Sequence, residues 1–181
     1  MDKCEIPQWR QILKSVRTKE EHLPSSKWLQ LATINENHEP RLRTVVFREW
    51  IDNTSFIIFT DRRSEKVIDI RENKSVEILW LFSKSKSQFR FKGKAEFIND
   101  SKKYWNKLSE KSKEKWFWPH PGKKREEFSL NNISFKSSAP YDFLVIKINI
   151  EITELLELTK PFHKRYLWEK DNNWNLIELN P

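Results

Sequence analysis

Short runs of β-branched and aromatic residues, separated by polar clusters typical of turns, fill the chain from Trp28 to its end. The connectors between these runs are short and polar, as hairpin loops between antiparallel neighbours are. The pattern predicts a mainly β (α+β) fold built as a barrel or a sandwich. We expect nine strands, at residues 28–34, 41–51, 55–60, 75–82, 88–98, 142–150, 152–158, 162–169 and 174–179.

Helical patterns precede and interrupt these strands. The apolar residues between Trp9 and Val16 have the i, i+3, i+4, i+7 spacing of an amphipathic helix. We also expect a helix at residues 64–72, with Ser64 as its N-cap, and a helical stretch at residues 100–116.

Residues 117–141 contain three prolines and Gly122, which predicts a long ordered loop or a segment that contacts a partner. The sequence shows no internal repeat, no low-complexity block and no linker long enough to separate two domains. We therefore expect one domain that spans residues 1–181.

The charge and glycine content limit the classes of function. The 34 Lys and Arg residues outnumber the 26 Asp and Glu, and the net charge of +8 favours nucleic acid, phosphorylated small molecules or an acidic protein as partners. The two glycines, Gly93 and Gly122, are far apart. A P-loop and a Rossmann fingerprint each need at least two glycines within a few residues, so both are excluded.

The chain has no apolar run long enough to cross a bilayer, and no segment typical of a signal peptide follows its first residues. The single cysteine, Cys4, has no partner for an intramolecular disulfide or a metal site, which indicates a reducing compartment. We expect a cytoplasmic protein that does not associate with membranes.

One cluster of polar residues could bind an anion. It lies on a strand, at the end of the next strand and at the start of the following helix, where free backbone N–H groups favour negative charge. Arginine can clamp phosphate oxygens, serine donates a hydroxyl, and lysine adds a point charge. A solvated basic face with an ordinary N-cap serine accounts for the same residues. The cluster consists of Arg41, Arg43, Arg48, Thr60, Asp61, Arg62, Arg63, Ser64 and Lys66.

Histidines do not form a metal site, because no two of the four are spaced i, i+4 and there is no second cysteine to join them. His163 alternates with Arg165 along a predicted strand, so both side chains belong to the same face. This histidine is either part of a site or a structural residue, and no catalytic residue can be assigned.

Residues 88–94 alternate aromatic with basic side chains, as in sheets that stack the bases of RNA or single-stranded DNA. A half-buried strand shows the same alternation, and the order of residues does not match the signature of RNA-recognition motifs. We favour core packing and do not expect nucleic acid as a partner.

Four motifs follow one another in an order that is characteristic of one known family. Residues 43–48 resemble a strand with the sequence Arg-x-Val-Leu-Leu-Lys, and residues 59–66 resemble a Tyr-Thr-Asn…Ser-Arg-Lys phosphate loop. Residues 88–96 are similar to a Gln-x4-Gly-x-Ala-Glu strand, and residues 163–181 carry a His-x-Arg motif, tryptophans and a Leu-x-Pro ending. Together they resemble the pyridoxamine 5′-phosphate oxidase-like, FMN-binding split-barrel family, over about residues 28–181.

The resemblance implies an antiparallel split β-barrel with a few peripheral helices, which forms a homodimer with FMN in clefts between the subunits. It implies that the phosphate is held by residues of the polar cluster and that the flavin ring is held by backbone and by a glutamine amide, with an arginine near the ring edge. The implied cofactor residues are Arg43, Thr44, Val45, Val46, Phe59, Thr60, Arg63, Ser64, Lys66, Gln88 and Arg165.

On the substrate side, the resemblance implies roles for Arg48, Tyr104 and His163, and we expect Arg48, His163 and Arg165 to line one cavity over the flavin. The chain departs from the true oxidase at two substrate anchors, where Pro161 and Leu108 stand in place of arginines. The resemblance therefore favours an FMN-dependent oxidoreductase whose small-molecule substrate is smaller or less charged than pyridoxamine phosphate.

The chain also departs from the family pattern at three further positions. Phe162 stands where the true oxidase has leucine, and Glu65 stands where the phosphate loop has arginine, with Arg63 beside it. Leu158 stands where the family has a flavin-contacting tryptophan. Residues 116–122 resemble a little-characterised subgroup of the superfamily. The alternatives are a non-catalytic flavin- or haem-binding split barrel, a basic nucleic-acid-binding β-barrel and a true pyridoxamine 5′-phosphate oxidase.

Overall fold

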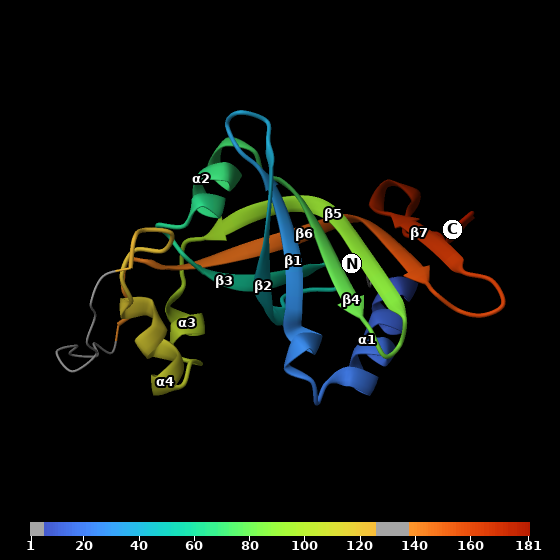
Figure 1. Cartoon of the computed structure of the whole chain (residues 1–181), viewed down its shortest axis with the longest axis horizontal. Helices are drawn as coiled ribbons and strands as arrows, with labels where there is room; N and C mark the ends of the chain where they lie inside the picture. Colours follow the sequence, from blue (N-terminus) through green and yellow to red (C-terminus); the bar gives the residue numbers. More distant parts are fainter. Residues whose placement is uncertain (1–5, 126–137) are drawn as a thin grey trace, which may run out of the picture.

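The strands form one antiparallel sheet in the order β3-β2-β1-β4-β5-β6-β7-β8, in a computed structural model that describes residues 6–125 and 138–181. Because β3 also pairs with β6, strands β1 to β6 close into a barrel, and β7 and β8 extend the sheet beyond it (Figure 1). The expected split-barrel class is confirmed. The strands are β1 (Trp28–Ile34), β2 (Pro40–Trp50), β3 (Ser55–Asp61), β4 (Ser75–Phe82), β5 (Ser87–Ile98), β6 (Phe143–Glu157), β7 (Lys164–Glu169) and β8 (Ile177–Leu179).

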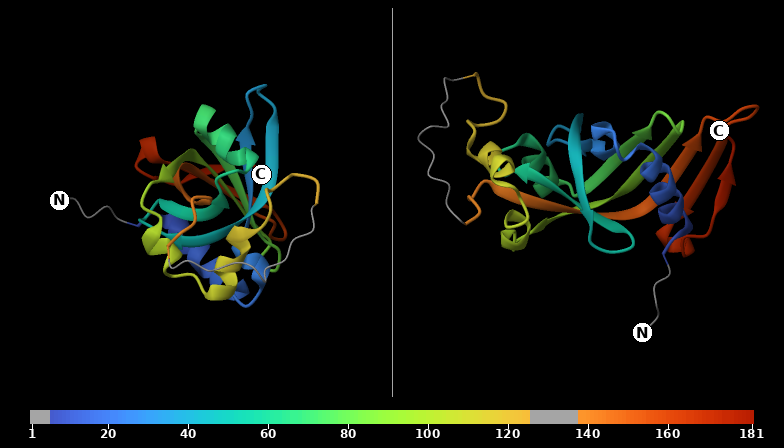
Figure 2. Two further views of the ribbon diagram at one scale, coloured as in Figure 1. Left: turned by 90° about the vertical axis from the view of Figure 1, so that its left-hand side faces the viewer. Right: turned by 90° about the horizontal axis from the view of Figure 1, so that it is seen from below.

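Helices lie at both ends of the barrel. α2 and α3 lie at one end, and α1 lies nearer the other end, toward β7 and the C-terminus (Figures 1 and 2). Among the described residues, no helix is long and apolar enough to span a membrane. The helices are α1 (Gln8–Glu20), α2 (Glu65–Glu72), α3 (Lys102–Trp105) and α4 (Glu110–Lys113), with 3-10 turns at Pro24–Lys27, Glu114–Phe117 and Lys170–Asn172.

The two strands expected at residues 142–150 and 152–158 are one strand, β6, so the prediction of nine strands was wrong. β5 pairs Lys92 with Ile152 and then Gly93 with Ile150, which leaves Glu151 as an extra residue in a bulge. A bulge bends a strand without ending it. The last strand is also shorter than expected, because Trp174 has a positive φ of 59° and belongs to a turn.

The single helix expected at residues 100–116 is broken into α3, α4 and a 3-10 turn. Tyr104 and Trp105 are buried in a small apolar cluster, and Ser109 adopts an extended backbone before α4 begins. Burial of these two rings fixes α3 against the barrel, and the chain then turns before the next helix. Cys4 and residues 126–137 of the expected loop lie outside the described residues.

Aromatic side chains fill the barrel. Trp9 of α1 is fully buried, and its ring centroid lies 5.6 Å from that of Phe91 and 6.0 Å from that of Trp50. α1 is amphipathic and buries Trp9, Leu13 and Val16 against this core. The apolar spacing that predicted this helix therefore also identified its buried face.

We expect Gly93→Ala to destabilise the protein strongly. A Cβ atom at this position would lie 2.0 Å from the backbone oxygen of Asn149, so β5 and β6 would have to separate at the bulge. Equilibrium urea unfolding should show a loss of about 3 kcal/mol or more.

Gly122→Ala is the matched control for this substitution. Gly122 has a positive φ of 78°, but an added Cβ meets no atom within 4 Å, so the cost should be about 1 kcal/mol of backbone strain. Equal stability of the two variants would contradict the assignment of Gly93 to a close strand contact.

Candidate functional site

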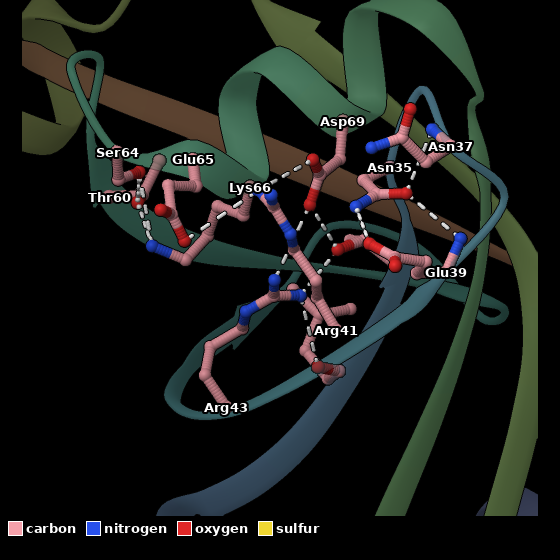
Figure 3. Close-up of polar contacts among 12 residues, drawn as sticks. Asn35, Asn37, Glu39, Arg41, Arg43, Thr60, Ser64, Glu65, Lys66 and Asp69 are labelled. Carbon is pink, nitrogen blue, oxygen red and sulfur yellow. Dashed lines mark hydrogen bonds and ion pairs between the residues drawn. The ribbon is translucent and has the colours of Figure 1, made fainter.

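The turn between β3 and α2 brings three hydrogen-bonding side chains together (Figure 3). The ammonium group of Lys66, in the first turn of α2, donates hydrogen bonds to Thr60 Oγ1 and Ser64 Oγ, both at 3.1 Å. The two hydroxyl oxygens are 3.2 Å apart, and both residues are buried. We call these three residues the Lys66 cluster. An ammonium and two hydroxyls at this spacing can bind one small anion together.

Local hydrogen bonds fix the shape of this turn. Ser64 Oγ donates to the backbone oxygen of Asp61 at 2.7 Å, so Ser64 occupies the N-cap position without a side-chain capping bond. The carboxylate of Asp61 accepts from Arg63 N at 2.8 Å and from Arg63 Nη2 at 2.7 Å. Burial acts to raise the pKa of Asp61, but the hydrogen bonds and charge of Arg63 hold it below its usual value.

The hydrogen bonds of Arg63 are made to the turn and to neighbouring segments, not to residues of the Lys66 cluster. Besides Asp61, its guanidinium donates to the backbone oxygen of Trp118 at 3.1 Å and lies 3.3 Å from the carboxylate of Asp142. These contacts tie the turn to two segments that are distant from it in the sequence. The structure thus gives Arg63 structural partners rather than a position beside Lys66.

Arg43 of β2 contacts a carboxylate that sequence reasoning did not find. Its Nη2 lies 3.4 Å from Asp69 Oδ2, and its Nη1 donates to Thr33 Oγ1 at 2.6 Å. Thr33 in turn donates to Asp69 Oδ2 at 2.6 Å, and Arg41 lies 3.4 Å from Asp69 Oδ1. The side chain of Asp69 is only 2% exposed, so two arginines and a hydroxyl compensate a buried charge.

A sequence signal for Asp69 exists. It lies between Val67 and Ile70, both fully buried, on the face of α2 that packs against the barrel. A carboxylate at a buried position of an amphipathic helix requires a cationic or hydrogen-bonding partner. The pairing connects α2 to β2, however, and one sequence does not reveal which cation that partner is.

Lys66 differs from the arginines in its electrostatic environment. Among the described residues, no carboxylate lies within 4.0 Å of its ammonium, whereas Arg41 and Arg43 both reach Asp69. Burial, and then the nearby charge of Arg43, lower the pKa of Lys66. Asp61 and other nearby carboxylates act to raise this pKa from beyond 4.0 Å. The direct hydrogen-bond partners of the ammonium are two neutral hydroxyls, an arrangement that can accept an anion from outside.

Arg48, Phe59 and Tyr104 lie together on the outer side of β2 and β3. The guanidinium carbon of Arg48 is 4.9 Å from the centre of the Phe59 ring, and that ring is 6.0 Å from the ring of Tyr104. Arg48 is exposed and Tyr104 is buried. On the same strand as Arg48, Thr44 and Val46 alternate with Val45, which packs into the barrel core.

Gln88 and Arg165 lie on either side of β6, because both pair with Leu156. Together with Arg90 and Glu154 they line a pocket of about 160 Å³. Arg165 donates to Glu154 Oε2 from Nε at 3.0 Å and from Nη2 at 2.6 Å, and Arg90 pairs with the same oxygen.

The carboxylate of Glu154 is therefore the anchor of this second group. Burial acts to raise the pKa of Glu154, but the hydrogen bonds from Arg165 and Arg90 lower it below its usual value. His163 is exposed and lines a second pocket of about 220 Å³ together with Arg165, Tyr166 and Glu178.

The two groups lie far apart within one chain. Thr60 pairs with Leu144 on β6, whereas Gln88 pairs with Leu156 on the same strand. Twelve residues of strand correspond to about 40 Å along its path. Of the three residues expected to line one cavity, His163 and Arg165 line the same pocket, whereas Arg48 lies on β2 beside Phe59.

The closed antiparallel barrel with its extension is a split β-barrel, and comparison with known proteins gives its family. The family model "pyridoxamine 5′-phosphate oxidase, FMN-binding domain" matches residues 6–99. The chain belongs to this family. The matched region contains the motif at residues 43–48 of β2 and the whole Lys66 cluster.

Curated relatives carry the names of oxidases. The chain is 38% identical over 113 residues to pyridoxine/pyridoxamine 5′-phosphate oxidase 2 of Arabidopsis thaliana, which covers 62% of this chain and 57% of the relative. It is 25% identical over 168 residues to pyridoxine/pyridoxamine 5′-phosphate oxidase of Ehrlichia chaffeensis, covering 83% of this chain and 84% of the relative. The chain thus spans little more than half the length of the Arabidopsis relative.

Solved structures agree with the fold. A pyridoxamine 5′-phosphate oxidase-related, FMN binding protein from Nostoc punctiforme superposes with a TM-score of 0.87 at 27% identity, covering 98% of this chain and 100% of that one. PhzG from Burkholderia lata, in complex with tetrahydrophenazine-1-carboxylic acid, superposes with a TM-score of 0.81 at 19% identity, covering 94% and 91%. The second likeness concerns the fold alone.

We expect Asp69→Asn to destabilise the protein by about 2–4 kcal/mol in urea unfolding, since it removes the buried counter-charge of Arg41 and Arg43. Glu65→Gln is the matched control. Glu65 pairs with Arg41 at 3.7 Å, but its side chain is 75% exposed, so its loss should cost less than about 0.5 kcal/mol. Similar losses in both variants would contradict the role assigned to Asp69.

Proposed function

We propose that the Lys66 cluster binds the phosphate of FMN. The observation that carries this proposal is the ammonium of Lys66, held by the hydroxyls of Thr60 and Ser64 with no carboxylate within 4.0 Å among the described residues. A phosphate dianion supplies the missing charge and accepts hydrogen bonds from Lys66 and Thr60, and from Ser64 once its hydroxyl turns away from the backbone oxygen of Asp61. The cluster also lies at the N-terminus of α2, whose free N–H groups favour an anion.

We propose that two copies of the chain complete each FMN site. Gln88 of β5 and Arg165 of β7, the residues expected at the flavin ring, lie on either side of β6 at the far end from Thr60, so one FMN cannot reach both groups of one chain. A second copy can bring its Gln88 and Arg165 to the first copy's Lys66 cluster.

Exposed apolar side chains between the two groups support a homodimer. Trp28 of β1, Leu42 of β2 and Leu81 of β4 are 49%, 70% and 46% exposed. Trp28 pairs with Val46, on the strand expected to contact the flavin ring. Large apolar side chains exposed on neighbouring strands are typical of a surface that another chain covers.

The proposed activity is that of an FMN-dependent oxidoreductase acting on a small molecule. Bound FMN supplies two-electron transfer. In this proposal the backbone of residues 44–46 and the amide of Gln88 orient the ring, and the positive charge of Arg165 lies near the ring edge. Glu154 orients Arg165 through its two hydrogen bonds.

Arg48, His163 and Tyr104 are the proposed substrate-side residues. Arg48 is exposed over the Phe59 ring, which leaves its guanidinium accessible to a carboxylate or another anion. Pro161 and Leu108 stand where the family has arginines, so this side offers fewer cations for a second phosphate. We therefore propose a substrate that is smaller or less charged than pyridoxamine phosphate.

We expect Lys66→Met to weaken FMN binding by about 2–4 kcal/mol, roughly a 30- to 700-fold rise in Kd. Riboflavin lacks the phosphate, so its Kd should be the same for the variant and the unchanged protein. Fluorescence quenching of the flavin measures both constants. Lys74→Met, which removes an exposed lysine just after α2, should leave both unchanged. Equal losses for FMN and riboflavin would refute the phosphate assignment.

A mixing experiment tests the shared site. Lys66→Met and Arg165→Met each damage both sites of their own dimers, but a mixed dimer has one undamaged site and one doubly damaged site. Co-expression in equal amounts should therefore restore high-affinity FMN binding at about a quarter of the sites. No recovery in mixed dimers, or a monomer with bound FMN in light scattering, would contradict a site built from two chains.

A further inference from the structure

A groove of about 1030 Å³ runs between α1 and the turn that joins β2 to β3. Residues of α1 from Arg10 to Glu21 form one side, and Trp50 and Asn53 form part of the other. No residue of the Lys66 cluster lines it. A cavity of this volume is large enough for a small organic molecule.

Two arginines of α1, Arg10 and Arg17, face this groove. They are seven residues apart, two helical turns, which places them about 10 Å apart along the same face. The guanidinium carbon of Arg10 lies 3.4 Å from the centre of a Trp50 ring, and that of Arg17 lies 4.7 Å from the centre of the Phe47 ring. Both cations therefore lie over aromatic rings, and one of these rings, that of Trp50, lines the groove.

The Nε atoms of both arginines are buried and have no hydrogen-bond partner among the described residues. No carboxylate of the described chain lies within 4.0 Å of either guanidinium, since neither takes part in a salt bridge there. Native proteins rarely leave buried polar atoms without partners, and a bound water or ion is one explanation for such an atom. Here the two unpartnered atoms belong to cations that line the same groove.

The surrounding charges do not neutralise the pair. Lys14 and Lys19 add positive charge to the groove, and Glu21 is the acidic residue among those that line it. Asp52 lies nearby, but its carboxylate accepts a hydrogen bond from Thr54 N at 2.8 Å and pairs with Lys147 at 3.7 Å.

Burial, followed by the charge of Arg17, lowers the pKa of Arg10 to about 10. The pKa of Arg17 is also lowered, again chiefly by burial. The fold thus holds two partly desolvated cations side by side. Apolar side chains of similar size could cover the aromatic rings without the free-energy cost of desolvating a cation. Packing alone therefore does not explain why two arginines occupy these positions.

We propose that this groove binds an organic anion with a phosphate or carboxylate group at Arg10 and Arg17 and an apolar body against Ile6 and Trp50, which also line the groove. Arginine suits this role because its planar fork matches the oxygens of phosphate and carboxylate. The site is separate from the proposed FMN phosphate site and does not depend on it.

Phenyl phosphate is a suitable probe because it combines a phosphate with an aromatic ring. The full-length protein, labelled with 15N-arginine, is titrated while the side-chain Nε–H signals of Arg10 and Arg17 are followed by NMR. We expect both signals to shift and to saturate with a Kd below about 1 mM. Absence of these shifts at about 10 mM probe, ten times that Kd, would overturn the proposal, whatever the behaviour of any variant. Inorganic phosphate should bind at least tenfold more weakly, and equal affinity would refute the apolar contact.

Conservative variants then test the contacts. Arg10→Lys and Arg17→Lys keep the charge but lose the planar fork, and each should raise the Kd at least tenfold. Lys27→Gln, an exposed lysine outside the groove, should leave the Kd unchanged. Equal affinity in all three variants would indicate non-specific attraction and refute the site.

Lys66→Met separates this proposal from the FMN proposal. It should leave the response of Arg10 and Arg17 to phenyl phosphate unchanged. If Lys66→Met abolishes binding of phenyl phosphate, the probe occupies the Lys66 cluster, and the groove proposal fails while the FMN proposal stands.

Discussion

Strand β6 is hydrogen-bonded along both edges, and the rest of the architecture depends on it. One edge pairs with β5 over nearly its whole length, while the other pairs with β3 in its first half and with β7 in its second half. The bulge at Glu151 lies where the strand leaves β3 and joins β7. The barrel closes on one side of this point, and the extension that carries Arg165 begins on the other.

The same strand separates the two groups of polar residues. The Lys66 cluster lies beside the first half of β6, and the group around Glu154 lies on and beside its second half. The two groups differ in how their positive charges are compensated. Glu154 pairs with two arginines within the chain, whereas Lys66 hydrogen-bonds to two hydroxyls and has no carboxylate within 4.0 Å among the described residues. This contrast is why the phosphate proposal rests on Lys66.

Local patterns predicted most of the fold, and long-range contacts account for the failures. Runs of β-branched and aromatic residues located six strands to within two residues, and Ser64 was placed correctly before α2. The break assigned near Glu151 was wrong because a bulge depends on the partner strand, where Gly93 approaches Asn149. Thr60, Ser64 and Lys66 were found because they are close in sequence. Asp69 and Glu154 were missed because their arginine partners lie on other elements.

Asp69 also determines how the positive charges of β2 are paired when no ligand is bound. Its carboxylate pairs with both Arg41 and Arg43 inside the protein, so the two cations of β2 share a counter-ion when no ligand is bound. If the Lys66 cluster holds the phosphate, as proposed, filling and emptying of the site is a local exchange of one anion at Lys66, and the ion pairs around Asp69 need not break.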